Sequence, residues 1–170
     1  MICTLIALTI FIAYIIIALI VFKEFPKSIS NTYYMYENIN KYLKYLFPAM
    51  IFTIVALMLP SWLEATKDSY LQFLTFFTCA SLLFVGAAPN FKSSKVENYV
   101  HSITAVISAI CAILWCILVV NTWGLVILNL IYFLIFALFT KTVKKSCVFW
   151  LEMTAFISLF ESLIVYNLVC

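Results

Sequence analysis

The sequence is short of charged residues, and this shortage defines its class. Only 10% of the 170 residues are charged and 66% are hydrophobic, whereas about 25% of the residues in a soluble domain are charged. A single soluble core of this size cannot hide so much apolar surface, so lipid must cover part of it. The apolar runs reach 18 or more residues without a polar alternation. This pattern excludes a β-barrel and predicts helices that cross a membrane.

Glycine, arginine and histidine are scarce or missing, and each shortage excludes a kind of site. Two glycines cannot form a phosphate-binding loop, and the motifs of nucleotide-binding proteins, zinc proteases and serine hydrolases do not occur. All ten basic residues are lysines spread along the chain, so we expect no nucleic-acid partner. The six cysteines form no C-x-x-C motif and the chain has one histidine. We therefore expect no metal site, no other cofactor and no assignable catalytic residues.

The apolar segments predict an all-α fold, a polytopic transmembrane helical bundle of about six spans that forms one domain over residues 1–170. The predicted spans are residues 2–22, 43–60, 70–88, 100–120, 124–140 and 147–169. The first segment lacks the basic region and the cleavage site of a signal peptide, so we expect it to be retained. The second span is expected to end at Pro60, because proline lacks the N–H that a helix interior uses.

The lysines predict how the bundle is oriented. Nine of the ten lie in the first, third and fifth loops, which share one side of the membrane, and only Lys67 lies in an even-numbered loop. Loops rich in lysine and arginine stay in the cytoplasm. We therefore expect a multi-pass protein of the inner (plasma) membrane, with odd-numbered loops in the cytoplasm and both termini outside.

A first set of polar residues is expected at the cytoplasmic ends of the spans. His101 opens the fourth span and is of a type that titrates near neutral pH. Glu152 lies at a comparable depth in the sixth span, so the two side chains have the geometry to meet. The first and third loops face the same side. The candidate functional polar site consists of His101, Glu152, Ser30, Asn31, Asn90 and Glu97. The alternative is that these residues only cap helices and pack loops.

A second set lies deeper in the bundle. Glu161 is in the sixth span and Asn129 in the fifth. Ionisable residues inside spans are costly, so they usually face the bundle interior or a polar cavity. Glu161 and Asn129 are therefore candidates for an intramembrane ion or proton site. The alternative is a polar clamp between two helices, with a stabilising effect of about 0.6–2 kcal/mol.

Two short motifs resemble those of a known family. "PKSISNTYY" follows the first span, and "GAAPNF" precedes "VHSITA" at the start of the fourth. The pattern resembles the damage-regulated autophagy modulator (DRAM) superfamily, whose small six-helix members carry P-x-I-S-[DN] after the first span and a histidine followed by alanine at the start of a later span. The sequence is also similar to uncharacterised small bacterial membrane proteins. The resemblance implies six spans and a membrane role, with Ser30, Asn31, His101 and Ala105 as matching positions. The usual aspartate of the family is Asn31 here.

Three functions are compatible with these features. The first, favoured by the lack of catalytic motifs, is a non-enzymatic membrane protein that binds membrane lipids or a protein partner, or assembles into a homo-oligomer. The second is a small transporter or channel that uses Glu161 and Glu152. The third is an intramembrane lipid-acting enzyme with His101 as general base, a role that requires hydrogen-bond reach of the substrate.

Overall fold

A computed structural model describes residues 1–169, and within them the chain is all-helical, as predicted. Seven α-helices and one short 3-10 helix follow one another along this part of the chain. They are α1 (Ile2–Phe22), α2 (Thr32–Glu37), η1 (Leu43–Tyr45), α3 (Leu46–Glu64), α4 (Gln72–Ala87), α5 (Lys95–Leu118), α6 (Trp123–Phe139) and α7 (Val143–Val169). No strand occurs between residues 1 and 169.

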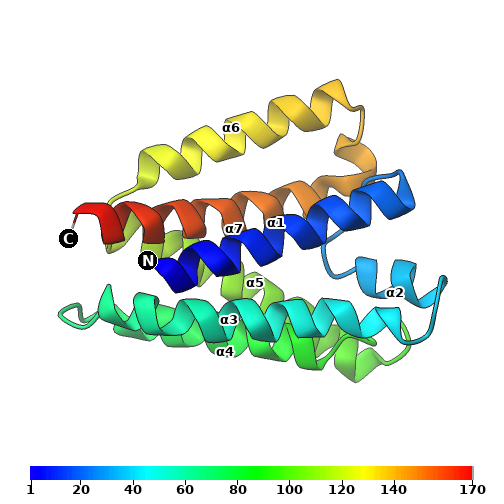
Figure 1. The fold of residues 1–170 in the computed structure, drawn as a ribbon, viewed down its shortest axis with the longest axis horizontal. Coiled ribbons are helices and arrows are strands. Elements are labelled where there is room, and N and C mark those ends of the chain that lie inside the picture. Colours follow the sequence, from blue (N-terminus) through cyan, green and yellow to red (C-terminus); the bar gives the residue numbers. More distant parts are fainter. Residues whose placement is uncertain (170) are drawn as a thin grey trace.

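The six long helices lie side by side and alternate in direction (Figure 1). Helix α7 contacts α1, α5 and α6, while α3 packs against α1 and α4, and α4 against α5. Met1 and the end of α7 lie at one end of the bundle, where the Met1 ammonium donates to Asn167 Oδ1 over 3.1 Å. The opposite end holds residues 23–45, 88–95 and 140–145 and nine of the ten lysines. We call it the lysine-rich end.

Helix length separates two groups of apolar segments. The helices α1, α5 and α7, and α3 together with η1, are long and apolar enough to cross a membrane. Helices α4 and α6 are apolar but have only 16 and 17 residues. At 1.5 Å per residue these are about 24 and 26 Å long, just short of the hydrocarbon core. The helices are those of a membrane-embedded protein, and the number six remains an approximate count of its spans.

Helix α3 does not end at Pro60 but continues to Glu64, which corrects the predicted boundary. Proline removes one backbone hydrogen bond, and tertiary packing compensates for this loss. Beyond Pro60, Trp62 is buried against Trp115 of α5, with ring centroids 5.4 Å apart in an edge-to-face arrangement. At the other boundary, α5 begins at Lys95 rather than at residue 100, because the Ser94 side chain accepts a hydrogen bond from the Glu97 N–H.

The first loop folds onto the lysine-rich end of the bundle. Its helix α2 buries Tyr33 and Tyr36, and the Tyr36 ring meets Phe22 at the end of α1, with centroids 4.9 Å apart. The hydroxyl groups of Tyr14 and Thr32 are 2.5 Å apart, which ties α2 to α1. The loop is thus part of the packed structure.

Replacing the buried indole of Trp115 should destabilise the bundle strongly. Trp115 is 0% exposed, whereas Trp123 at the start of α6 is 56% exposed and serves as a matched control. We expect Trp115→Ala to lower the free energy of unfolding by about 3–5 kcal/mol, because it leaves a cavity in the core. Thermal unfolding in detergent measures the effect. Equal shifts for Trp115→Ala and Trp123→Ala would contradict the packing described.

Candidate functional site

A strap made of residues 25–30 crosses the beginning of α7. Helix α7 is broken at Ser146, whose backbone angles are φ −130° and ψ 28°. A break leaves the N–H groups of the following turn without partners in their own helix. The strap supplies one partner, because the Phe149 N–H donates to the carbonyl of Lys27 over 3.1 Å. The Ser146 hydroxyl also donates to the Phe25 carbonyl over 3.2 Å.

Glu152 lies one helical turn beyond Phe149 in α7 and holds the strap at Ile29. Its Oε2 accepts a hydrogen bond from the Ile29 N–H at 2.5 Å. Ile29 is only 2% exposed, so this amide would otherwise be buried without a partner. The strap ends in a local turn, where the Ser28 hydroxyl contacts that of Ser30 at 2.9 Å and accepts from the Asn31 N–H at 3.0 Å. A carboxylate in the last helix thus holds the first loop.

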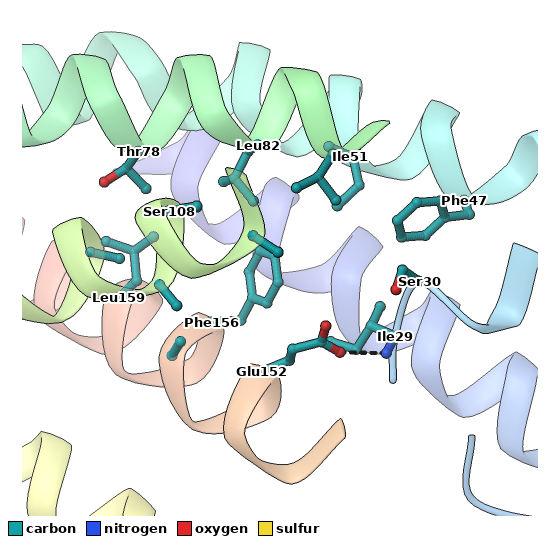
Figure 2. Close-up of a pocket in the computed structure, with 15 residues that line it drawn as sticks. Ile29, Ser30, Phe47, Ile51, Thr78, Leu82, Ser108, Glu152, Phe156 and Leu159 are labelled. Carbon is teal, nitrogen blue, oxygen red and sulfur yellow. Dashed lines mark hydrogen bonds between the residues drawn. The ribbon is translucent and has the colours of Figure 1, made fainter. Parts of the chain in front are cut away.

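A cavity lies beside the strap, between α3, α4, α5 and α7 (Figure 2). The cavity is partly open, and the space that the centres of water molecules can occupy in it is about 60 Å³. Its lining is apolar except for three hydroxyl side chains and one carboxyl group. The polar lining residues are Ser30, Thr78, Ser108 and Glu152. Figure 2 shows Glu152 and Ser30 together on one side of the cavity, with Thr78 and Ser108 farther along it.

Small side chains on α5 help to create this space. Ala105, Ser108, Ala109 and Ala112 all line the cavity. Their spacing of three and four residues places them on one face of the helix. Opposite them, α7 contributes another small residue, Ala155. These short side chains cannot fill the volume between the two helices, so a groove remains along α5.

His101 lies outside the lining of this cavity. It is 5% exposed, its Nδ1 is 3.1 Å from the Ala88 carbonyl oxygen, and its ring stacks on Phe91 with centroids 4.3 Å apart. These contacts join the start of α5 to the end of α4. Within residues 1–169 no hydrogen bond or ion pair connects His101 with Glu152. The structure therefore gives these two residues separate partners.

The other predicted polar residues form a network at the surface of the lysine-rich end. Asn90 accepts from the Tyr33 hydroxyl at 3.0 Å, and its N–H donates to Glu97 at 3.1 Å. The Lys92 ammonium donates to Asn31 Oδ1 at 2.5 Å. These bonds tie α2 and the residue before it to the loop between α4 and α5. The six predicted residues thus divide among the cavity, the surface network and the packing around His101.

Partial burial shifts the pKa of groups in this network. Loss of solvation lowers the pKa of the Lys92 ammonium, and the nearby charge of Lys27 lowers it further. Loss of solvation raises the pKa of Tyr33, an effect that the charge of Lys44 partly offsets. It also raises the pKa of Tyr34, which accepts from the Lys92 N–H. Both phenols are therefore neutral hydrogen-bonding groups at neutral pH.

The structure brings Glu161 and Asn129 together at the other half of the bundle. The Asn129 amide donates to Glu161 Oε2 at 2.6 Å and to the Ser158 hydroxyl at 3.1 Å. Nearby, the hydroxyl groups of Thr122 and Ser162 are 2.6 Å apart. This polar group links α6 and the segment before it to α7. Glu161 does not line the cavity that contains Glu152, so the two carboxyl groups occupy separate places.

Sequence reasoning missed the strap and its attachment to α7. One signal was available, because Ser146 directly precedes the predicted span 147–169 and serine favours helix starts. The partners of the strap have no sequence signature, since the Phe25 and Lys27 carbonyls and the Ile29 N–H are backbone groups. The cavity was missed as well. Its only sequence signal is the row of small residues on α5.

The chain matches no protein-family model, and no curated protein or solved structure is significantly similar to it. The resemblance to the DRAM superfamily stays a prediction that rests on its short motifs. Two of the positions it names, Ser30 and Ala105, line the same cavity, while His101 and Asn31 do not.

Removing the Glu152 carboxylate should loosen the strap. In Glu152→Ala the Ile29 N–H loses its partner, at a cost of about 1–3 kcal/mol. We expect amide hydrogen exchange at Ile29 to accelerate roughly tenfold or more. Glu152→Gln keeps an acceptor oxygen and should change exchange less, and Glu161→Ala should leave Ile29 unchanged. Unaltered exchange in Glu152→Ala would show that the strap does not depend on this bond.

Proposed function

We propose that the protein is an integral membrane protein that binds a membrane lipid, or another apolar molecule, in the cavity beside the strap. The observation that carries this proposal is the cavity itself, whose apolar lining is interrupted by one carboxyl group and three hydroxyl groups. Binding sites for small molecules are typically concave and mostly apolar, with a few placed polar groups that fix orientation. The cavity between α3, α4, α5 and α7 has this composition.

The position of the cavity supports a ligand drawn from the bilayer. Its walls are helices of a membrane-embedded bundle, and it extends from the strap at the lysine-rich end to the middle of the bundle. An amphiphile from the adjacent leaflet therefore has its polar group at the depth of the strap and its chain between the helices. The strap forms the wall of the cavity on one side, where Ile29 and Ser30 line it.

Two other functions receive less support from the arrangement of the polar residues. A proton or ion path through both acidic residues needs a connection between them, yet Glu161 bonds to Asn129 and lies outside the cavity of Glu152. A general base must reach its substrate, yet His101 bonds to Ala88 and stacks on Phe91. Assembly into a homo-oligomer stays a prediction.

Filling the cavity should displace the bound lipid. Ala109 lines the cavity, whereas Val106, three residues earlier on α5, is 58% exposed on the outer face. We expect Ala109→Trp to reduce co-purifying lipid several-fold and Val106→Trp to leave it unchanged, as measured by native mass spectrometry from mild detergent. Thermal unfolding verifies that both variants are folded. Wild-type protein without lipid, or equal retention by both variants, would contradict the proposal.

We also propose that the lysine-rich end faces the cytoplasm of a cell whose inner (plasma) membrane holds the protein. Its nine lysines support this orientation under the positive-inside rule. Alkaline phosphatase fused after the last residue should then be active in a bacterial host, and green fluorescent protein at the same place should be dark. Reporters fused after Lys92 should show the reverse. A fluorescent C-terminal fusion would invert the proposed orientation.

A further inference from the structure

We infer that the ligand of the cavity is an amphiphile with a protonated amine, which binds the free carboxylate oxygen of Glu152. This inference rests on the proposed function, because it specifies the chemistry of the ligand in the same cavity. It depends on the geometry of Glu152, the charges around the cavity and the nature of its walls.

The geometry leaves half of the Glu152 carboxylate unused. Oε2 is bound to the Ile29 N–H. The other oxygen makes no hydrogen bond within residues 1–169, and Figure 2 shows it on the cavity side of the Glu152–Ile29 bond. A carboxylate offers about four lone-pair positions, and the strap occupies one of them. The strap also fixes the side chain, so the free oxygen is oriented before a ligand arrives.

The described residues that line the cavity include no basic side chain to balance the charge of this carboxylate. Two lysines of the nearby end have other partners, because Lys92 bonds to Asn31 and Lys44 pairs with Glu37 at 2.7 Å. A carboxylate in apolar surroundings is costly unless a cation or further hydrogen-bond donors meet it. A protonated primary amine supplies both, with one positive charge and three N–H donors.

The remaining walls suit an unbranched apolar chain. Ile51, Leu82, Phe156 and Leu159 line the cavity away from the strap, and Phe47 lies beside Ser30 (Figure 2). The small residues of α5 leave room between these side chains. A ligand whose amine lies at Glu152 therefore has its chain in an apolar groove. An anionic head group would instead meet an uncompensated negative charge.

Three unbranched probes with the same number of carbon atoms test this inference. Dodecylamine, dodecanol and dodecanoate each have twelve carbon atoms and differ in the head group, and their binding is measured by competition with a fluorescent alkyl probe. The protein is held in phosphatidylcholine nanodiscs, because that lipid has no N–H donor. We expect dodecylamine to bind wild-type protein at least about tenfold more tightly than dodecanol, and dodecanoate to bind most weakly. Binding that persists in Ala109→Trp is subtracted as partition into the bilayer.

Matched variants identify the group that selects the amine. Glu152→Gln keeps the size of the side chain but removes the charge, so it should abolish the tenfold preference. Glu152→Asp keeps the charge and should retain part of the preference, and Glu161→Gln should retain it fully. Thermal unfolding confirms that each variant is folded.

The outcomes distinguish a failure of the amine inference from a failure of the proposed function. If wild-type protein binds dodecylamine and dodecanol equally, or if Glu152→Gln keeps the preference, the amine inference is overturned. The proposed function still stands in that case, provided that Ala109→Trp blocks all probes. If no probe binds wild-type protein above the Ala109→Trp background, the proposed function itself fails.

Discussion

The hydrogen bond from the Ile29 N–H to the Glu152 carboxylate connects the first loop with the last helix, and the site depends on it. Non-helical backbone near a membrane must have its polar groups paired, because lipid offers them no partner. Glu152 of α7 accepts the hydrogen bond of the Ile29 N–H in the strap. In return, the Lys27 and Phe25 carbonyls of the strap accept hydrogen bonds from Phe149 and Ser146 at the break in α7. Each irregular segment thus supplies hydrogen-bond partners to the other, and the cavity lies beside the place where they meet.

The cavity and the strap come from different features of the sequence. Short side chains on α5 leave room between helices, whereas the break at Ser146 and the carboxylate of Glu152 position the strap beside that room. The proposed site for an amphiphile needs both features. A groove without the carboxylate has no means of orienting a ligand, and a carboxylate without the groove has only the strap to bind.

The helical bundle was predictable from the sequence because apolar runs of this length have few alternatives in a protein. Boundaries were less predictable, and Pro60 is the clearest case. Proline disfavours a helix interior by local geometry, but the buried contact of Trp62 with Trp115 lies beyond it and holds the helix together. The site was predictable only as a set of polar residues near one end. Which of them meet depends on backbone positions that no pattern of side chains encodes, as the separate partners of His101 and Glu152 illustrate.

The attachment of the strap also constrains how the chain assembles during synthesis. Ile29 and Glu152 are 123 residues apart in sequence, so the ribosome completes nearly the whole bundle before the acceptor exists. Until α7 arrives, the strap has three backbone groups without their final partners, and α1 lacks the aromatic contact between Phe11 and Phe156. The last helix therefore does more than add a span. Its insertion brings Glu152, Ala155, Phe156 and Leu159 to the cavity and completes the wall that α7 contributes.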